Sequence, residues 1–263
     1  MRSPSQTSSS LREFAEAPDA YLAPAPGVRV VDGERYYASV SGDGKWIGVC
    51  RLRFGPGEAT AVFAEVQALR PGAQTGWMTP RADLVGPLTA AGCHAPEPPL
   101  LPSFTALVTD REPPAVAGIE VRRIESFEDH LLGLEIDLAS STFTEAGAAR
   151  RRSEARQSYE RRRVRPGGQW LAYVDGRPVA WAGAVAGPRG LYLSGGATLP
   201  EARGHGCYRA LVRARWDDAV RRGTPALAVG AQETSRPILE RCGFDVVCTM
   251  YELESDALLD STA

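Results

Sequence analysis

Arg203-Gly204-His205-Gly206-Cys207-Tyr208 is the stretch that decides the fold of this 263-residue chain. The residues before it, Leu191–Thr198, predict a strand, and the residues from Cys207 to Arg222 predict a helix. A glycine-rich turn between a strand and a helix aims free backbone N–H groups and the positive end of the helix dipole at one point. Such a point binds an anion, and a diphosphate suits it best. The stretch therefore predicts a phosphorylated cofactor in the C-terminal half.

The composition is that of an ordinary globular protein, with 43% hydrophobic and 24% charged residues. No apolar run reaches the roughly 18 residues that a membrane helix needs. The Ser-rich segment Met1–Ser10 lacks the apolar core of a secretion signal and is predicted to be a disordered tail. The five cysteines are scattered without CxxC spacing, so we expect no disulfide framework and no metal site, and a reducing, cytoplasmic location.

The net charge of −2 gives no general attraction to nucleic acid. One segment is a local exception, because eight arginines crowd sixteen residues: Arg150, Arg151, Arg152, Arg156, Arg161, Arg162, Arg163 and Arg165. The structural interpretation is a solvated helix face, partly offset by Glu154 and Glu160. The functional interpretation is a docking face for a phosphate-bearing ligand, with RNA among the candidates.

A proline-rich segment divides the chain into two predicted halves. The segment Glu112–Ala115 (EPPA) is predicted to link residues Leu11–Arg111 to residues Ala117–Leu259. Each half begins with a short predicted strand, Gly27–Val31 in the first and Gly118–Arg122 in the second. Each also ends with a short helix that stops at a glycine and is followed by an apolar strand. This similarity suggests an internal repeat.

The predicted elements give an α/β fold with a mixed sheet and helices on its faces. The Asp175-Gly176 pair predicts a hairpin turn. In the C-terminal half we predict strands at 119–122, 170–174, 178–185, 191–198, 226–231 and 245–253, and helices at 127–141, 146–163, 207–222 and 235–242. In the N-terminal half we predict strands at 36–41, 46–54, 75–79 and 104–108, and helices at 58–70 and 82–91.

Two blocks of the C-terminal half resemble the GNAT superfamily of N-acyltransferases. Residues Ala197–Leu211 are similar to the acyl-CoA signature R/Q-x-x-G-x-G/A, which Arg203 and Gly206 match in its first and fourth positions. Tyr208 stands at the sixth position, where the family has Gly or Ala. Residues Ser235–Phe244 are similar to the last helix of the family and its Gly-Phe ending.

The resemblance implies two GNAT-like mixed-sheet domains in tandem. The N-terminal half resembles a degenerate copy, with the strand Trp77–Pro80 and the helix Leu84–Gly92 but no glycine-rich turn. We therefore expect it not to bind CoA and to wall the substrate cleft. The alternative is an unrelated small α/β domain.

The resemblance also implies where an acyl-CoA binds. Backbone amides of the turn would hold the diphosphate, the backbone before it would pair with the pantetheine arm, and Gly195 and Gly196 fit a bulge or a close approach of the acyl group. The cofactor residues so predicted are Ala197, Thr198, Leu199, Arg203, Gly204, His205, Gly206, Cys207 and Ser235. No metal is implied. Although Cys207 opens a helix, it has no evident acid or base partner, so we expect its side chain to pack.

The proton chemistry is less defined, because Leu239 stands where many family members have a Tyr. Tyr208, Tyr251, Ser235 and Glu201 are the substitutes that we consider for general acid and base. Each also has a structural interpretation: Tyr251 as a packed strand residue, for example, and Glu201 as a solvated loop charge.

The leading hypothesis is an acyl-CoA-dependent N-acyltransferase, with acetyl-CoA as donor and a small amine as acceptor. A second hypothesis is transfer from aminoacyl-tRNA on the same fold, with the tRNA bound through Arg150–Arg165. A third is a non-catalytic CoA-binding module, which the missing Tyr would explain. No membrane partner is expected.

Overall fold

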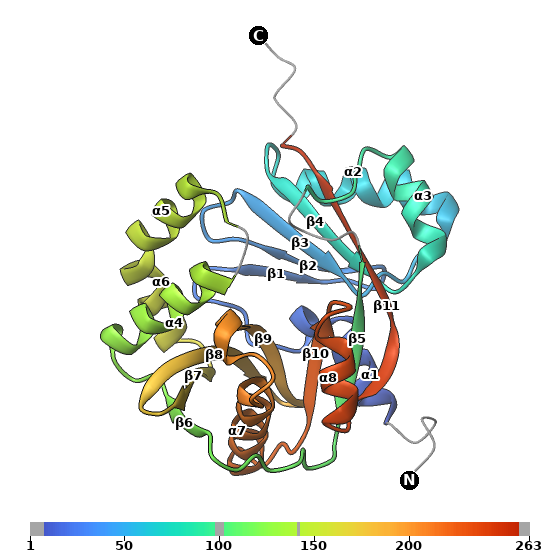
Figure 1. Ribbon diagram of the computed structural model, residues 1–263. Coiled ribbons are helices and arrows are strands. Elements are labelled where there is room, and N and C mark those ends of the chain that lie inside the picture. Colours follow the sequence, from blue (N-terminus) through green and yellow to red (C-terminus); the bar gives the residue numbers. More distant parts are fainter. Residues whose placement is uncertain (1–7, 98–102, 141–142, 258–263) are drawn as a thin grey trace. The chain divides into compact units, whose positions relative to one another are not determined.

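The computed structural model describes residues 8–97, 103–140 and 143–257 (Figure 1). Within these residues the chain forms two compact units. The C-terminal unit comprises residues 8–11, 108–229 and 234–245, and the N-terminal unit comprises residues 12–107, 230–233 and 246–257. None of the helices in the described ranges is long and apolar enough to cross a membrane.

This division differs from the predicted halves at both ends of the chain. The strand β11 (Asp245–Ser255), predicted to complete the C-terminal half, pairs with β4 (Gln74–Thr79) in the N-terminal unit. Near the start of the chain, helix α1 (Ser9–Glu16) begins within the segment predicted to be a disordered tail. Residues 1–7 of that tail lie outside the described residues.

The C-terminal unit is built on a mixed sheet with the strand order β10-β9-β8-β7-β6. Its strands are β6 (Glu120–Arg123), β7 (Gly167–Val174), β8 (Arg177–Gly187), β9 (Gly190–Thr198) and β10 (Leu227–Ala231). Strands β9 and β10 are parallel, whereas β6 to β9 are antiparallel. The β7–β8 hairpin turns at Asp175 and Gly176, whose φ values of 49° and 74° are those that this tight turn requires.

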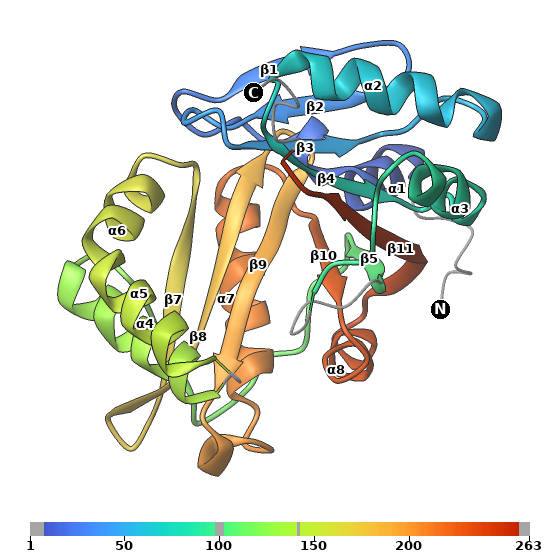
Figure 2. The ribbon, with the colours of Figure 1, turned by 90° about the horizontal axis from the view of Figure 1, so that it is seen from above.

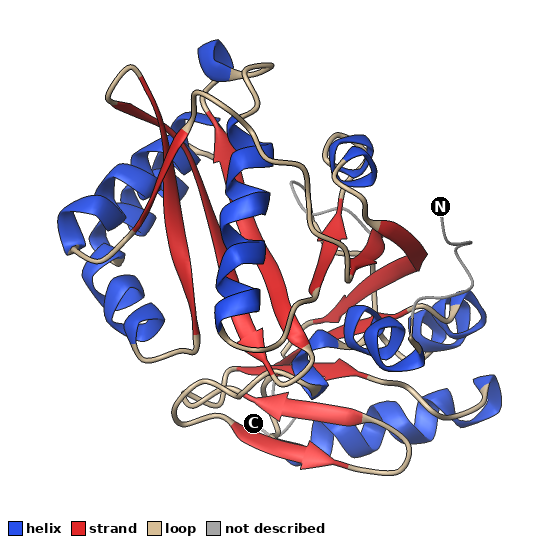
Figure 3. Cartoon of the chain, turned by 90° about the horizontal axis from the view of Figure 1, so that it is seen from below, coloured by secondary structure: helices blue, strands red, loops and turns tan. Residues whose placement is uncertain are grey.

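Helices cover both faces of this sheet (Figures 2 and 3). Helix α7 (Cys207–Arg221) lies on one face, and α4 (Phe127–Ser140) lies on the other, with α6 (Ala155–Arg163) packed against α4. The single helix predicted at 146–163 is two helices, α5 (Glu145–Ser153) and α6. At the break, the Arg150 carbonyl accepts hydrogen bonds from both the Glu154 N–H (3.0 Å) and the Ser153 hydroxyl (2.8 Å).

The N-terminal unit has the strand order β1-β2-β3-β4-β11-β5. The remaining elements are β1 (Arg29–Asp32), β2 (Tyr37–Val40), β3 (Trp46–Cys50), β5 (Ser103–Thr109), α2 (Ala59–Leu69), α3 (Ala82–Ala90) and the short helices Pro18–Ala20 and Pro56–Glu58. Phe63 of α2 and Trp77 of β4 stack in its core, with ring centroids 6.0 Å apart. The parallel β3–β4 pair and the antiparallel β4–β11 pair make this sheet mixed as well. The predicted mixed α/β fold class is confirmed.

A buried polar cluster fixes β11 in the N-terminal unit. The hydroxyls of Ser255 and Thr75 are hydrogen-bonded at 2.6 Å, Gln67 Nε2 donates to Ser255 Oγ at 2.9 Å, and Trp77 Nε1 donates to Thr75 Oγ1 at 2.7 Å. Because buried polar groups are costly when they lack partners, this cluster defines the register of β11 against β4.

Candidate functional site

Strand β9 is interrupted by a bulge at its two exposed glycines. Trp181 of β8 pairs with Ala197, and Gly183 of β8 pairs with Ser194, so Gly195 and Gly196 together face a single residue of β8. Gly195 has a φ of 63°, and a Cβ atom there would lie 2.8 Å from the Trp181 ring. Only glycine fits this position without strain. The bulge predicted from the glycine pair is thus present, and it turns the backbone of β9 outward.

The second half of β9 has a free edge within the C-terminal unit. The register between β9 and β10 covers Leu191–Leu193 and Leu227–Val229 alone. From Ser194 to Thr198, β9 pairs within this unit only with β8. An unpaired strand edge presents backbone N–H and C=O groups that can bind an extended ligand. The backbone of Ala197 and Thr198, predicted to contact the pantetheine arm, lies on this edge.

The turn after β9 presents a row of free backbone donors. Gly204 and Gly206 have φ values of 84° and 90°, and Gly206 precedes α7 without a side-chain cap. In the part of the chain that the structure describes, none of the backbone N–H groups from Gly204 to Tyr208 has a backbone acceptor. Gly204 and His205 are exposed. Alternating left-handed residues ahead of a helix form a concavity of N–H groups that suits an anion.

The side chains around this turn have structural contacts of their own. Arg203 is exposed, and its Nε donates to the Thr198 carbonyl at 3.4 Å, which ties the turn to the end of β9. Leu199 continues the strand, with its N–H donating to the Val179 carbonyl at 2.9 Å. The Cys207 side chain is buried, and this burial raises the pKa of its thiol. The Cys207 side chain therefore contributes to packing, as expected from the sequence.

Tyr208 and Arg215 fill the space between α7 and the bulge. The half-buried Tyr208 ring lies 3.4 Å from the position that a Cβ atom on Gly196 would take. Arg215 is fully buried, and its guanidinium donates to the carbonyls of Leu211 (2.9 Å) and Gly183 (3.2 Å). Burial lowers the pKa of Arg215, and these bonds connect α7 to β8 beside the bulge.

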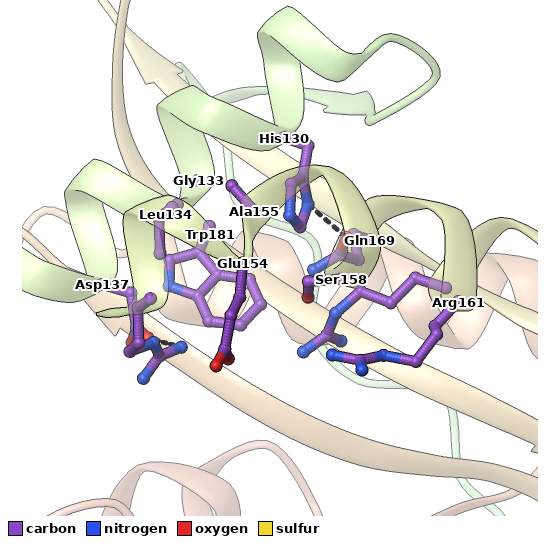
Figure 4. Close-up of a pocket in the computed structure, with 12 residues that line it drawn as sticks. His130, Gly133, Leu134, Asp137, Glu154, Ala155, Ser158, Arg161, Gln169 and Trp181 are labelled. Carbon is purple, nitrogen blue, oxygen red and sulfur yellow. Dashed lines mark hydrogen bonds and ion pairs between the residues drawn. The ribbon is translucent and has the colours of Figure 1, made fainter. Parts of the chain in front are cut away.

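A pocket of about 90 Å³ lies on the opposite face of the same sheet (Figure 4). Helix α4 and the face of α6 that turns toward it form the walls. Gln169 of β7 and Trp181 of β8 form the floor. Because the Trp181 ring also lies against Gly195, the pocket adjoins the bulge in β9.

His130 of α4 is a buried imidazole in this pocket. It is hydrogen-bonded through Nδ1 to Gln169 Oε1 at 3.1 Å, and its ring packs against Phe127 and Tyr159. Burial lowers the pKa of His130, so the ring is neutral at pH 7. Since the amide oxygen of Gln169 is an acceptor, Nδ1 carries the proton and Nε2 is left as the basic nitrogen.

The charged side chains of the pocket are only partly paired. Asp137 of α4 accepts an ion pair from Arg151 at 2.7 Å. Glu154, Arg161 and Arg162 also line the pocket, and among the described residues their side chains have no hydrogen-bond or ion-pair partner. The pKa of Arg162 is lowered by desolvation and by the positive charge of Arg151 nearby.

The other predicted proton-transfer residues lie apart from this pocket. Glu201 is exposed in the short helix Pro200–Ala202, and Ser235 precedes α8 (Arg236–Arg241), where its carbonyl accepts the N–H of Ile238. Tyr251 lies on β11 opposite Thr79, in the N-terminal unit. Leu239, at the position of the expected Tyr, is fully buried. Within the described residues no cluster of His, Cys, Asp and Glu could hold a metal.

The arginine segment is partly neutralised by its surroundings. Arg151 pairs with Asp137, Arg152 pairs with Glu135, and Arg156 lies 3.7 Å above the Phe127 ring. Arg163 contacts Glu160 at 3.5 Å. Much of this predicted docking face therefore consists of local ion pairs, while Arg161 and Arg162 line the pocket instead.

Comparison with known proteins shows which family and which solved structures this chain resembles. Residues 135–244 match the acetyltransferase (GNAT) family. A GCN5-related N-acetyltransferase from Kribbella flavida is similar in structure, with a TM-score of 0.62, 15% identity, and coverage of 93% of this chain and 95% of that chain. A functionally unknown conserved protein from Staphylococcus epidermidis has a TM-score of 0.65 at 11% identity, with 97% and 100% coverage.

A tandem GNAT protein from the clavulanic acid biosynthesis pathway is similar as well, with a TM-score of 0.57, 16% identity, and coverage of 99% of this chain and 91% of that chain. No curated protein sequence matches the chain. The predicted resemblance to tandem GNAT proteins is confirmed at the level of the fold. The chain therefore has a GNAT fold over almost its whole length, and its residues 135–244 match the acetyltransferase (GNAT) family.

Proposed function

We propose that the C-terminal unit transfers an acyl group from acyl-CoA to the amine of a small molecule. Acetyl-CoA is the donor that we propose first. The observation that carries this proposal is the row of unpaired N–H groups at Gly204–Tyr208, directly after a bulged strand with a free edge. The amine nitrogen would attack the thioester carbonyl carbon. The new C–N bond forms, the C–S bond breaks, and the thiolate leaves and takes up a proton.

Each part of the donor has a matching part of the chain in this proposal. The amides of Gly204–Cys207 hold the diphosphate, and the exposed guanidinium of Arg203 adds positive charge. The backbone of Ala197–Leu199 pairs with the pantetheine arm along the free edge of β9. A Cβ atom on Gly204 would meet no other atom within 4 Å, so a ligand has open access to the turn.

Proton transfer in this proposal uses side chains of the pocket together with Tyr208 on the opposite face of the sheet. Glu154, beside Trp181 at the end of the pocket next to the bulge, accepts the proton of the attacking amine, and the neutral imidazole of His130 is a second base of the pocket, beside Gln169. Tyr208, whose ring lies against Gly196, is the predicted proton donor whose contacts reach the bulge. Both observations, and the pocket itself, favour an enzyme over a CoA-binding module. The ion pairs of the arginine segment favour a small acceptor over tRNA.

Isothermal titration with acetyl-CoA tests the position of the donor site. Asp and Asn both tolerate the left-handed backbone of Gly204 better than other side chains do, and they differ mainly in charge. Gly204→Asp should weaken acetyl-CoA binding at least about tenfold relative to Gly204→Asn, because it places a carboxylate beside the diphosphate.

A matched control is Gly86→Asp in α3, where a Cβ atom also meets nothing within 4 Å. This variant should bind acetyl-CoA like the wild type. Equal affinities for Gly204→Asp and Gly204→Asn would contradict the proposed site, and absence of binding to the wild type would contradict the proposed function.

A further inference from the structure

The charges in the pocket are separated along the axis of α6. Glu154, Ser158, Arg161 and Arg162 recur at helical spacing, so they lie on the one face of α6 that lines the pocket. Figure 4 shows the Glu154 carboxylate beside Trp181, whereas the Arg161 side chain lies at the other end, below Gln169. The pocket thus has an acidic end near the bulge and a basic end away from it.

The basic end has donors that no protein group uses. Arg161 and Arg162 are exposed, and among the described residues their guanidinium groups have no hydrogen-bond or ion-pair partner, so a ligand can reach both. Arg162 also reaches down to the sheet, with Nη1 3.8 Å from the position of a Cβ atom on Gly183. Gly183 pairs with Gln169 on one side and Ser194 on the other. The absence of a side chain at Gly183 therefore leaves room above the sheet next to Arg162.

Trp181 adds a second, independent donor. Its side chain is 6% exposed and lines the pocket, yet the indole Nε1 is buried and has no hydrogen-bond partner in the described structure. A buried N–H without a partner is costly unless a ligand oxygen supplies the acceptor. This N–H offers a donor for a ligand oxygen at the Glu154 end of the pocket, while the two guanidinium groups offer donors for an oxyanion at the other end.

We propose that the acyl acceptor is a small amine that also carries a carboxylate or another oxyanion. This inference rests on the proposed function and names its substrate class. Arg161 and Arg162 hold the oxyanion, since the planar guanidinium matches carboxylate and phosphate oxygens in pairs. Glu154 holds the ammonium group at the end beside Trp181, next to Gly195 of the bulge. A second oxygen of the ligand, or its carbonyl group, accepts from Trp181 Nε1.

The test is a titration followed by nuclear magnetic resonance at the Trp181 indole N–H, which is assigned with Trp181→Phe. Probes come in pairs: glycine with glycinamide, β-alanine with β-alaninamide, and phosphoethanolamine with ethanolamine. In the wild type, at least one anionic probe should shift this resonance saturably, with an affinity at least about fivefold higher than that of its neutral partner. A preference confined to the phosphoethanolamine pair would identify the oxyanion as phosphate.

Variants assign the effect to the arginines. Arg162→Gln should weaken the anionic probe at least about fivefold, and Arg162→Lys, which keeps the charge but not the paired donors, should fall between the two. Arg163→Gln is the matched control on the same helix, since Arg163 faces Glu160 and does not line the pocket.

The proposal is overturned if no anionic probe gives a saturable shift, if the neutral partners bind equally well, or if Arg162→Gln changes nothing. This titration involves no CoA. Its failure is therefore separate from failure of the proposed acyl transfer, which is judged by acetyl-CoA binding at the turn.

Discussion

Asp218 joins the end of α7 to the sheet through three arginines. Its carboxylate accepts from Arg222 (2.7 Å), Arg221 (3.0 Å) and Arg123 (3.1 Å), and its side chain is 5% exposed. Burial acts to raise the pKa of Asp218, but the hydrogen bonds and charges of Arg222, Arg221 and Arg123 outweigh it, so the pKa is lowered. Arg222 also donates to the Gly167 carbonyl at 3.2 Å, which extends the link to β7.

Asp218→Asn should reduce the free energy of unfolding at pH 7 by about 2 kcal/mol, because it leaves the arginines without their shared carboxylate. The pKa of Asp218 in the folded protein lies below the unfolded value of about 3.9, so its stabilisation is fully present above about pH 4. It is lost as the pH falls through the folded-state pKa. Urea unfolding of both proteins at pH 7, 5 and 3 measures this.

The difference between wild type and Asp218→Asn should therefore shrink at pH 3. Asp217→Asn is the control, since Asp217 forms a more exposed pair with Arg213 and should change stability little. A constant difference between wild type and Asp218→Asn across the three pH values would show that the charge of Asp218 contributes nothing.

At the scale of elements, the strand, turn and helix of the proposed donor site were the most predictable part of the chain. The predicted strand 191–198 and helix 207–222 differ from β9 and α7 by one residue each. Their signals are local, because consecutive residues of the sequence indicate both the glycine turn and the start of the helix. The prediction of one helix over 146–163 missed the break between α5 and α6, because no Pro or Gly in the sequence marks it.

Strand β11 shows the opposite case, in which tertiary pairing decides where an element belongs. Its residue pattern predicts a strand, but nothing within 245–255 indicates that β4 of the first half is its partner. Leu253 and Ser255 are buried, and Ser255 hydrogen-bonds Thr75 and Gln67. The core of the N-terminal unit is therefore incomplete without the end of the chain.

A chain that ends at Phe244 should leave the N-terminal unit without a stable core, because β11 lies between β4 and β5 in its sheet. We expect amide hydrogen exchange in β2, β3 and β4 to lose its protection, since the edge of β4 and the polar cluster are exposed. A chain that ends at Ala257 keeps the contacts of β11 and is the control. Undiminished protection in β4 of the shorter chain would refute this role of β11.

At the scale of the whole molecule, the proposed donor site and the proposed acceptor pocket differ in how the sequence encodes them. The turn at Gly204–Tyr208 is one continuous segment, so its strand–turn–helix geometry could be predicted from spacing. The pocket combines His130 of α4, Arg162 of α6 and Trp181 of β8. A single sequence gives no sign that these residues meet. The sequence offered one signal for the pocket, the helical spacing of Glu154, Ser158 and Arg162, which indicates that these three side chains share one face.

The central claim is that acyl-CoA binds through the backbone amides of the turn before α7. The most direct measurement is a titration of the ¹⁵N-labelled protein with CoA, followed at the amide resonances of Gly204, His205 and Gly206. We predict that these three resonances shift together and saturate at one affinity, while that of Gly86 in α3 stays unchanged. The claim is contradicted if the resonances of the turn remain in place at CoA concentrations that saturate shifts elsewhere, or if no resonance responds to CoA.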